Sequence, residues 1–291
     1  MREWLAAALL AALTALPRSA GAAPTADEAR AAIRAVNNSV SAAYSPPRLN
    51  YGEPSDGQVA SYPNAKYFDT ETGWLTRGGL SVAASLMRPC LGLDNVLAQV
   101  SFSRAIGKVR YNGFAQFIFG NVPLQADSLA TIEDWGLVLG KGFAWGDRFL
   151  FTPLLAYGYH AWDRDAAATF QGGTLEHYRH HSIEVGNRLQ FAATQRLVLT
   201  GEARFGTTLF AHIDVPGVLS ARLGSESIAN LSAEADYAVA RWAPLELHVF
   251  GGWRFTHFGY GQSAVDAKSG YLEPFSMTDL NSYQTGLRFS F

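Results

Sequence analysis

Apolar and polar residues alternate with a period of two along most of the chain beyond about residue 73. In the segment 180–191 one face is apolar and the other polar: Ile183, Val185, Leu189 and Phe191 against His180, Ser182, Glu184, Arg188 and Gln190. Successive side chains of a strand point to opposite faces, so this pattern predicts strands with one apolar side. We predict strands at 73–87, 95–105, 108–119, 131–144, 149–161, 178–192, 196–210, 228–240, 245–259 and 280–291.

The lengths of these strands and of their connections favour a membrane barrel over a soluble sandwich. The strands run to about ten to fifteen residues, against five or six in most sheets. Short turns at 144–147, 193–196 and 240–244 alternate with long polar connections at 162–177, 212–227 and 260–279. Aromatic residues gather near both strand ends, as in the two aromatic girdles of outer-membrane barrels. The predicted fold is all-β, a transmembrane antiparallel up-and-down barrel of about ten strands. The alternatives are twelve strands, if 49–51 adds a pair, and eight, if 88–120 is loop.

The N-terminal region has the features of an export signal. Residues 1–22 combine Arg2, an apolar stretch from Leu5 to Leu16 and a small-residue cleavage site ending at Ala22. Residues 23–46 follow, and the apolar spacing of Ile33, Val36 and Val40 fits a short helix. This periplasmic segment is expected to be either a mobile lead or a helix docked as a plug. The barrel is expected at 47–291.

Composition narrows the functional classes. Charged residues make up 16% of the 291 residues, aromatic residues 13%, and the net charge is −2. This excludes a disordered chain, which needs low hydrophobicity and high charge, and argues against a nucleic-acid partner. The lone Cys90 has no intramolecular disulfide partner.

The last twelve residues, LNSYQTGLRFSF, place Tyr283, Leu287, Phe289 and Phe291 on one face. Here the chain resembles bacterial outer-membrane β-barrel proteins, whose assembly machinery reads a final strand that ends in an aromatic residue. Three further stretches, DTETGWL, YGYHAWDRD and HYRHHSIEVGN, resemble Gram-negative outer-membrane barrels of unassigned role. The resemblance implies outer-membrane location, contact with membrane lipid and lipopolysaccharide, and no cofactor.

Opposite charges recur on the inward faces of neighbouring strands. The expected lumen network comprises Glu184, Arg188, Glu202, Arg204, Asp236, His248, Arg254 and Arg288. A turn centred on Thr194 places Glu184 opposite Arg204 and Arg188 diagonal to Glu202, and a turn centred on Trp242 places Asp236 opposite His248. Lys108 and Arg110 are also expected to point inward. The network either rigidifies a filled lumen or lines a charge-selective pore.

Three side-chain groups were weighed as chemical sites and set aside. His180, Ser182 and Glu184 resemble a lipid A deacylase site only in part, because the surrounding sequence differs. A metal site at His177, His180 and His181 is not favoured, because they lie at a loop-to-strand junction and no cysteine joins them. His212 and Asp214 reverse the order of the omptin proteases. We therefore predict no catalytic residue, metal or cofactor.

The expected role is a non-enzymatic envelope-structural or narrow porin-like barrel. A lipid-modifying or proteolytic barrel enzyme, and a surface adhesion or recognition protein that acts through its loops, stay open as alternatives.

Overall fold

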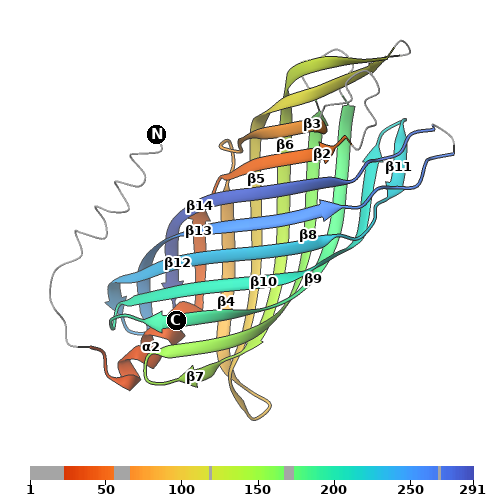
Figure 1. The fold of residues 1–291 in the computed structure, drawn as a ribbon. Helices are drawn as coiled ribbons and strands as arrows, with labels where there is room; N and C mark the ends of the chain where they lie inside the picture. The colour runs from red at the N-terminus through yellow and green to blue at the C-terminus, as the bar shows by residue number, and fades with distance from the viewer. Residues whose placement is uncertain (1–22, 56–65, 118–119, 167–173, 268–269) are drawn as a thin grey trace.

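A computed structural model describes residues 23–55, 66–117, 120–166, 174–267 and 270–291. Long antiparallel strands form the wall of a tilted barrel, with one helix at the end where the strands are joined by short turns (Figure 1). The elements are α2 (Ala26–Asn37), β1 (Ser39–Tyr44), β2 (Pro47–Pro54), β3 (Tyr67–Trp74), β4 (Leu80–Cys90), β5 (Leu93–Phe117), β6 (Gly120–Lys141), β7 (Phe143–Trp145), β8 (Phe149–Ala166), β9 (Thr174–Ala192), β10 (Leu197–Val215), β11 (Leu219–Arg222), β12 (Ser227–Trp242), β13 (Leu245–Tyr260) and β14 (Ser276–Ser290).

The last strand closes the ring against the first. One edge of β14 pairs with β13, and its other edge pairs first with β1 and then with β2. The strands β3 and β4 likewise follow one another along β5. With β1 and β2 counted as one strand and β3 and β4 as another, the described residues form a ring of ten. The predicted barrel class and strand number are confirmed.

The predicted count of ten strands is nevertheless the result of two errors that cancel, because one strand was missed and another was counted as two. The segment 39–54 was not predicted as a strand, although it supplies β1 and β2, so the barrel begins at Ser39 and not at residue 47. The predicted strands 95–105 and 108–119 are the single strand β5. The predicted break at 106–107 also reversed the assumed faces beyond it. Lys108 and Arg110 therefore point outward, Lys108 toward Asp127 at 4.0 Å and Arg110 toward Gln125 at 2.8 Å.

The outer surface carries an apolar band between aromatic side chains. Val185, in the middle of β9, is 64% exposed. At the short-turn end Trp145 packs against Phe149, and toward the long-loop end Phe102 packs against Trp135. Exposed apolar side chains flanked by aromatic ones are what a barrel presents to lipid. None of the helices in the described ranges is long and apolar enough to cross a membrane.

The helix α2 fills the short-turn end of the lumen. Thr25 and Glu28 form a capping box that fixes its first turn. Its apolar stripe belongs to one buried cluster with inward-facing side chains of six strands, and the members are Ala29, Ala32, Ile33, Val36, Met87, Leu97, Val138, Leu150, Leu154, Ala156, Ala192 and Val198. At its C-terminal end Asn37 donates a hydrogen bond to Gln190, 2.7 Å away. Of the two expectations for residues 23–46, the docked helix is the one observed, and the predicted signal segment 1–22 lies outside the described residues.

Candidate functional site in the barrel lumen

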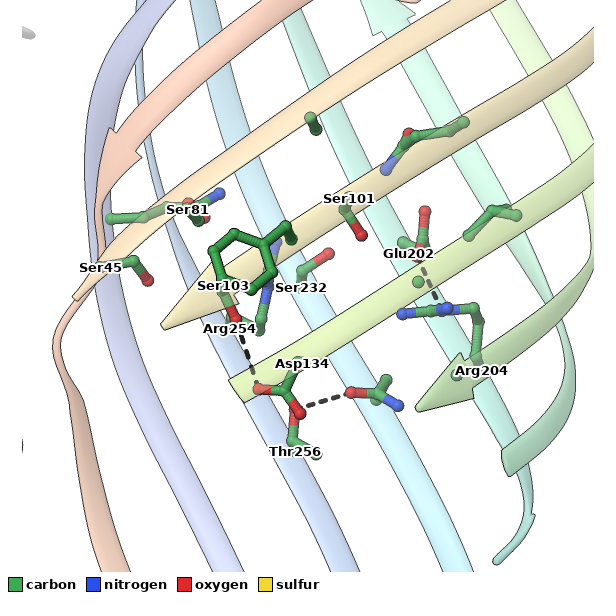
Figure 2. A pocket seen from close by; sticks show the side chains of 18 of the residues that line it. Ser45, Ser81, Ser101, Ser103, Asp134, Glu202, Arg204, Ser232, Arg254 and Thr256 are labelled. Carbon is green, nitrogen blue, oxygen red and sulfur yellow. Dashed lines mark hydrogen bonds and ion pairs between the residues drawn. The ribbon is translucent and has the colours of Figure 1, made fainter. Parts of the chain in front are cut away.

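The middle of the lumen is a polar cavity of about 260 Å³. Figure 2 shows serine, arginine and carboxylate side chains from several strands turned toward one space. The cavity reaches the C-terminal end of α2, where Val36 and Asn37 contribute to its lining. Its wall is rich in hydroxyl groups, among them those of Ser101, Ser103 and Ser232.

The first charged cluster of the lumen lies on β9 and β10 and centres on Glu202. In the observed register Glu202 lies opposite Arg188, and Arg204 lies opposite Gly186. Glu202 accepts from Arg188 at 2.7 Å and pairs with Arg204 at 2.9 Å, whereas Glu184 is 3.8 Å from Arg204. The expected register was therefore wrong by two residues. The hairpin turn is centred on Gln195 and not on Thr194, because Ala192 pairs with Val198.

The second cluster joins β12, β13 and β14. Arg288 pairs with Asp236 and lies 2.8 Å from Glu234. His248 lies 2.5 Å from Asp236, although Asp236 is opposite Phe250 and His248 is opposite Ala238 in the ladder. The hairpin turn lies at Ala243 and Pro244 and not on Trp242, because Trp242 pairs with Leu245. Beyond the one-residue bulge between Ala238 and Ala240 the ladder is two residues out of the expected register, so the two side chains meet diagonally.

Arg254 also points into the cavity, between these two clusters. Its neighbours in the ladders are Ser232 on β12 and Ser282 on β14. The eight residues of the expected network thus all face the lumen, but they form two paired groups and one arginine that stands apart.

The long-loop half of the lumen is filled by apolar and aromatic side chains. Trp162 stacks on Tyr178, and Tyr178 stacks on Tyr260, with ring centroids 5.3 and 5.2 Å apart. Phe258 and Ile132 are buried in the same cluster. This layer separates the polar cavity from the long-loop end.

Within that layer lies a buried arginine that the sequence reasoning missed. Arg164 is 2% exposed and its guanidinium contacts the ring of Tyr51, 4.6 Å from the centroid. Four carboxylates surround it at 2.8, 2.8, 3.2 and 3.6 Å: Asp69, Glu176, Glu71 and Glu53. The alternation of Asp69 and Glu71 in DTETGWL was an available signal, but both residues precede the first predicted strand, which was expected at 73–87.

A fifth carboxyl group lies beside this cluster on the connection between β13 and β14. Glu273 accepts a hydrogen bond from the Tyr178 hydroxyl at 2.6 Å. Burial, and after it the negative charge of Glu176, raises the pKa of Glu273 from its ordinary value of 4.5 to about 8. The raised pKa favours the protonated, uncharged form of Glu273 near neutral pH.

The rejected catalytic and metal groups are separated in the structure. His180 is hydrogen-bonded to Tyr260 at 3.0 Å, whereas Ser182 donates to Glu184 at 3.2 Å. His177 pairs with Asp163 and His181 with Tyr157 on the outward face, opposite to His180. No group of three metal-ligating side chains occurs among the described residues.

The other set-aside pair and the predicted assembly signal lie on the outer surface. His212 contacts the Ser220 hydroxyl at 3.3 Å. Tyr283, Leu287 and Phe289 point outward from β14. Phe291 follows the strand, and its backbone amide donates to the carbonyl of Asn38 at 3.0 Å.

The chain matches no protein-family model and no curated protein, but solved structures share its architecture. The outer membrane protease OmpT from Escherichia coli is 8% identical with a TM-score of 0.53, and the match covers 88% of this chain and 97% of that one. The translocator domain of the autotransporter NalP from Neisseria meningitidis is 11% identical with a TM-score of 0.37 (87% and 89% covered). The Pseudomonas putida toluene transporter TodX is 8% identical with a TM-score of 0.32 (87% and 88% covered). The chain has the fold of outer-membrane β-barrel proteins.

Proposed function

We propose that this protein is a non-enzymatic outer-membrane barrel of closed lumen, with an envelope-structural or at most ion-scale porin-like role. The observation that carries the proposal is α2, whose apolar stripe is buried in one cluster with inward side chains of six strands at the short-turn end. In the outer membrane this end faces the periplasm, because short turns lie on that side. Membrane lipid and lipopolysaccharide are then the partners of the outer surface.

The lumen filling supports the same role. Above α2 the charged clusters tie facing strands together, and above them the aromatic layer and Arg164 occupy the long-loop half. A groove of about 360 Å³ remains beside α2, bordered by Arg34, Met87 and Asn95. Such spaces admit water and small ions, whereas a sugar would have to displace packed side chains.

The test is conductance of the refolded protein in planar lipid bilayers. The wild type is expected to give ion-scale conductance or none, and liposomes that contain it are expected not to swell in disaccharide. Ile33→Asp combined with Val36→Asp places charge on the buried stripe of α2, which should release the helix and raise the conductance. Ala31→Asp, on the exposed side of the same helix, is the matched control and should behave as the wild type.

Disaccharide permeation through the wild type would overturn the closed-lumen proposal. Equal conductance of the Ile33→Asp/Val36→Asp variant and the control, with both variants folded by their heat-modifiable mobility, would show that α2 does not close the barrel.

A further inference from the structure

Arg254 is unlike the other arginines of the polar cavity because it has no partner. Arg188 and Arg204 pair with Glu202, and Arg288 pairs with Glu234 and Asp236. Over the described part of the chain, no hydrogen bond or ion pair involves the Arg254 side chain, which is exposed to the cavity. A guanidinium carries five N–H donors, so Arg254 has unused donors to offer to a bound acceptor.

Arg254 is repelled by Arg204 and attracted by three carboxylates, those of Glu202, Glu234 and Asp134. These carboxylates are already engaged. Glu202 holds two arginines, Glu234 accepts from Arg288 and Gln284, and Asp134 lies 2.6 Å from His160.

Side chains with hydroxyl groups also surround the Arg254 guanidinium. Ser232 lies opposite Arg254 in the β12–β13 ladder, and Ser103 and Thr256 line the same cavity. Figure 2 shows Arg254, Ser103, Ser232 and Arg204 turned toward the same space. Arginine forks with nearby hydroxyl groups are well suited to a carboxylate or phosphate, which accept bidentate hydrogen bonds.

We propose that the cavity is a binding site for a small oxyanion, held by Arg254 and placed between it and Arg204. The bound anion satisfies the free guanidinium and removes the repulsion between the two arginines. Carboxylates and phosphate share the required chemistry. The site goes beyond the closed-barrel role and does not depend on it, because an anion can be retained in a barrel that conducts or in one that does not.

The experiment is a titration of the refolded full chain in detergent micelles, with inorganic phosphate in one arm and acetate in the other. Sodium chloride maintains constant ionic strength, and binding is measured by isothermal calorimetry. Incubation is long because α2 covers the short-turn end of the cavity and is expected to slow entry of the anion. The wild type should show saturable binding of one anion per chain. Arg254→Gln should weaken it at least tenfold, whereas Arg241→Gln, which removes an arginine paired with Glu246 outside the cavity lining, should leave it unchanged.

A second variant keeps the test decisive if Arg254→Gln folds poorly. Ser232→Asp places a carboxylate directly opposite Arg254, where it should pair with the guanidinium and abolish phosphate and acetate binding without loss of stability. Wild-type heats no larger than the chloride control in both arms would overturn the proposal. Unchanged affinity in a folded Arg254→Gln or Ser232→Asp variant would do the same. Conductance is not read in this experiment, so its outcome is separate from that of the closed-lumen test.

Discussion

Replacing Glu202 by glutamine removes the carboxylate that joins two arginines in the lumen. Arg188 would keep a hydrogen bond to Gln99 at 2.9 Å, and Arg204 would keep Glu184 at 3.8 Å. Two unit charges about 4 Å apart interact by about 4 kcal/mol at an effective dielectric constant of about 20. Loss of one member of a buried pair costs about 3–5 kcal/mol, and water in the cavity reduces this. We expect Glu202→Gln to lower the free energy of unfolding by about 3 kcal/mol.

The assay is equilibrium urea unfolding of the protein refolded in lipid vesicles, followed by tryptophan fluorescence. A double-mutant cycle of Glu202→Gln with Arg204→Gln should give a coupling energy above about 1.5 kcal/mol. The cycle of Glu184→Gln with Arg204→Gln should give less than about 1 kcal/mol, since Asn230 and Ser182 already donate to Glu184 at 2.8 and 3.2 Å.

The outer-surface pair of Arg104 and Glu133, 3.0 Å apart and half exposed, is the matched control. Its coupling should be about 0–1 kcal/mol. A larger coupling for Glu184 with Arg204 than for Glu202 with Arg204 would refute the observed register and restore the pairing expected from the sequence.

Three further predictions concern the chain end, the long-loop half and the strand contacts. Deleting Phe291 should reduce assembly into the outer membrane, measured as the heat-modifiable fraction in membranes, and a normal yield would contradict its role as an assembly signal. Because the pKa of Glu273 is raised to about 8 in the folded state, stability should fall as the pH rises from about 4.5 to 8. Glu273→Gln should flatten that dependence in urea titrations across this range, and an unchanged slope would count against a buried neutral carboxyl. Gly186→Ala should destabilise the barrel by about 1–3 kcal/mol, because an added Cβ would lie 2.1 Å from the Ala203 carbonyl oxygen. Gly201→Ala should be tolerated, because no atom lies within 4 Å of the new methyl group. Equal urea midpoints for the two variants would show that β9 and β10 can move apart at Gly186.

The sequence by itself determined the class of fold. Period-two alternation and strand length are local properties, and they survive in the structure because lipid and lumen impose opposite polarity on the two faces of each strand. The inward orientation of Glu184, Glu202 and Arg254 follows from this parity. A strand break was wrongly predicted before Lys108, and the predicted inward and outward orientations beyond it were therefore reversed.

The tertiary structure decided the pairings and the contents of the lumen. Which charges meet depends on turn length and on the bulge after Ala238, and a shift of two residues exchanges one partner for another without altering the alternation. The apolar stripe of α2 is compatible with many surfaces, and only closure of the ring provides the inner wall that it packs against. Arg164 pairs with a carboxylate on the neighbouring strand β9 and with three on β2 and β3, which lie far from it in the sequence and face it only in the closed barrel. Arg254 follows the same inward-outward alternation as the other lumen residues. Only the three-dimensional structure shows that, among the described residues, its side chain makes no ion pair.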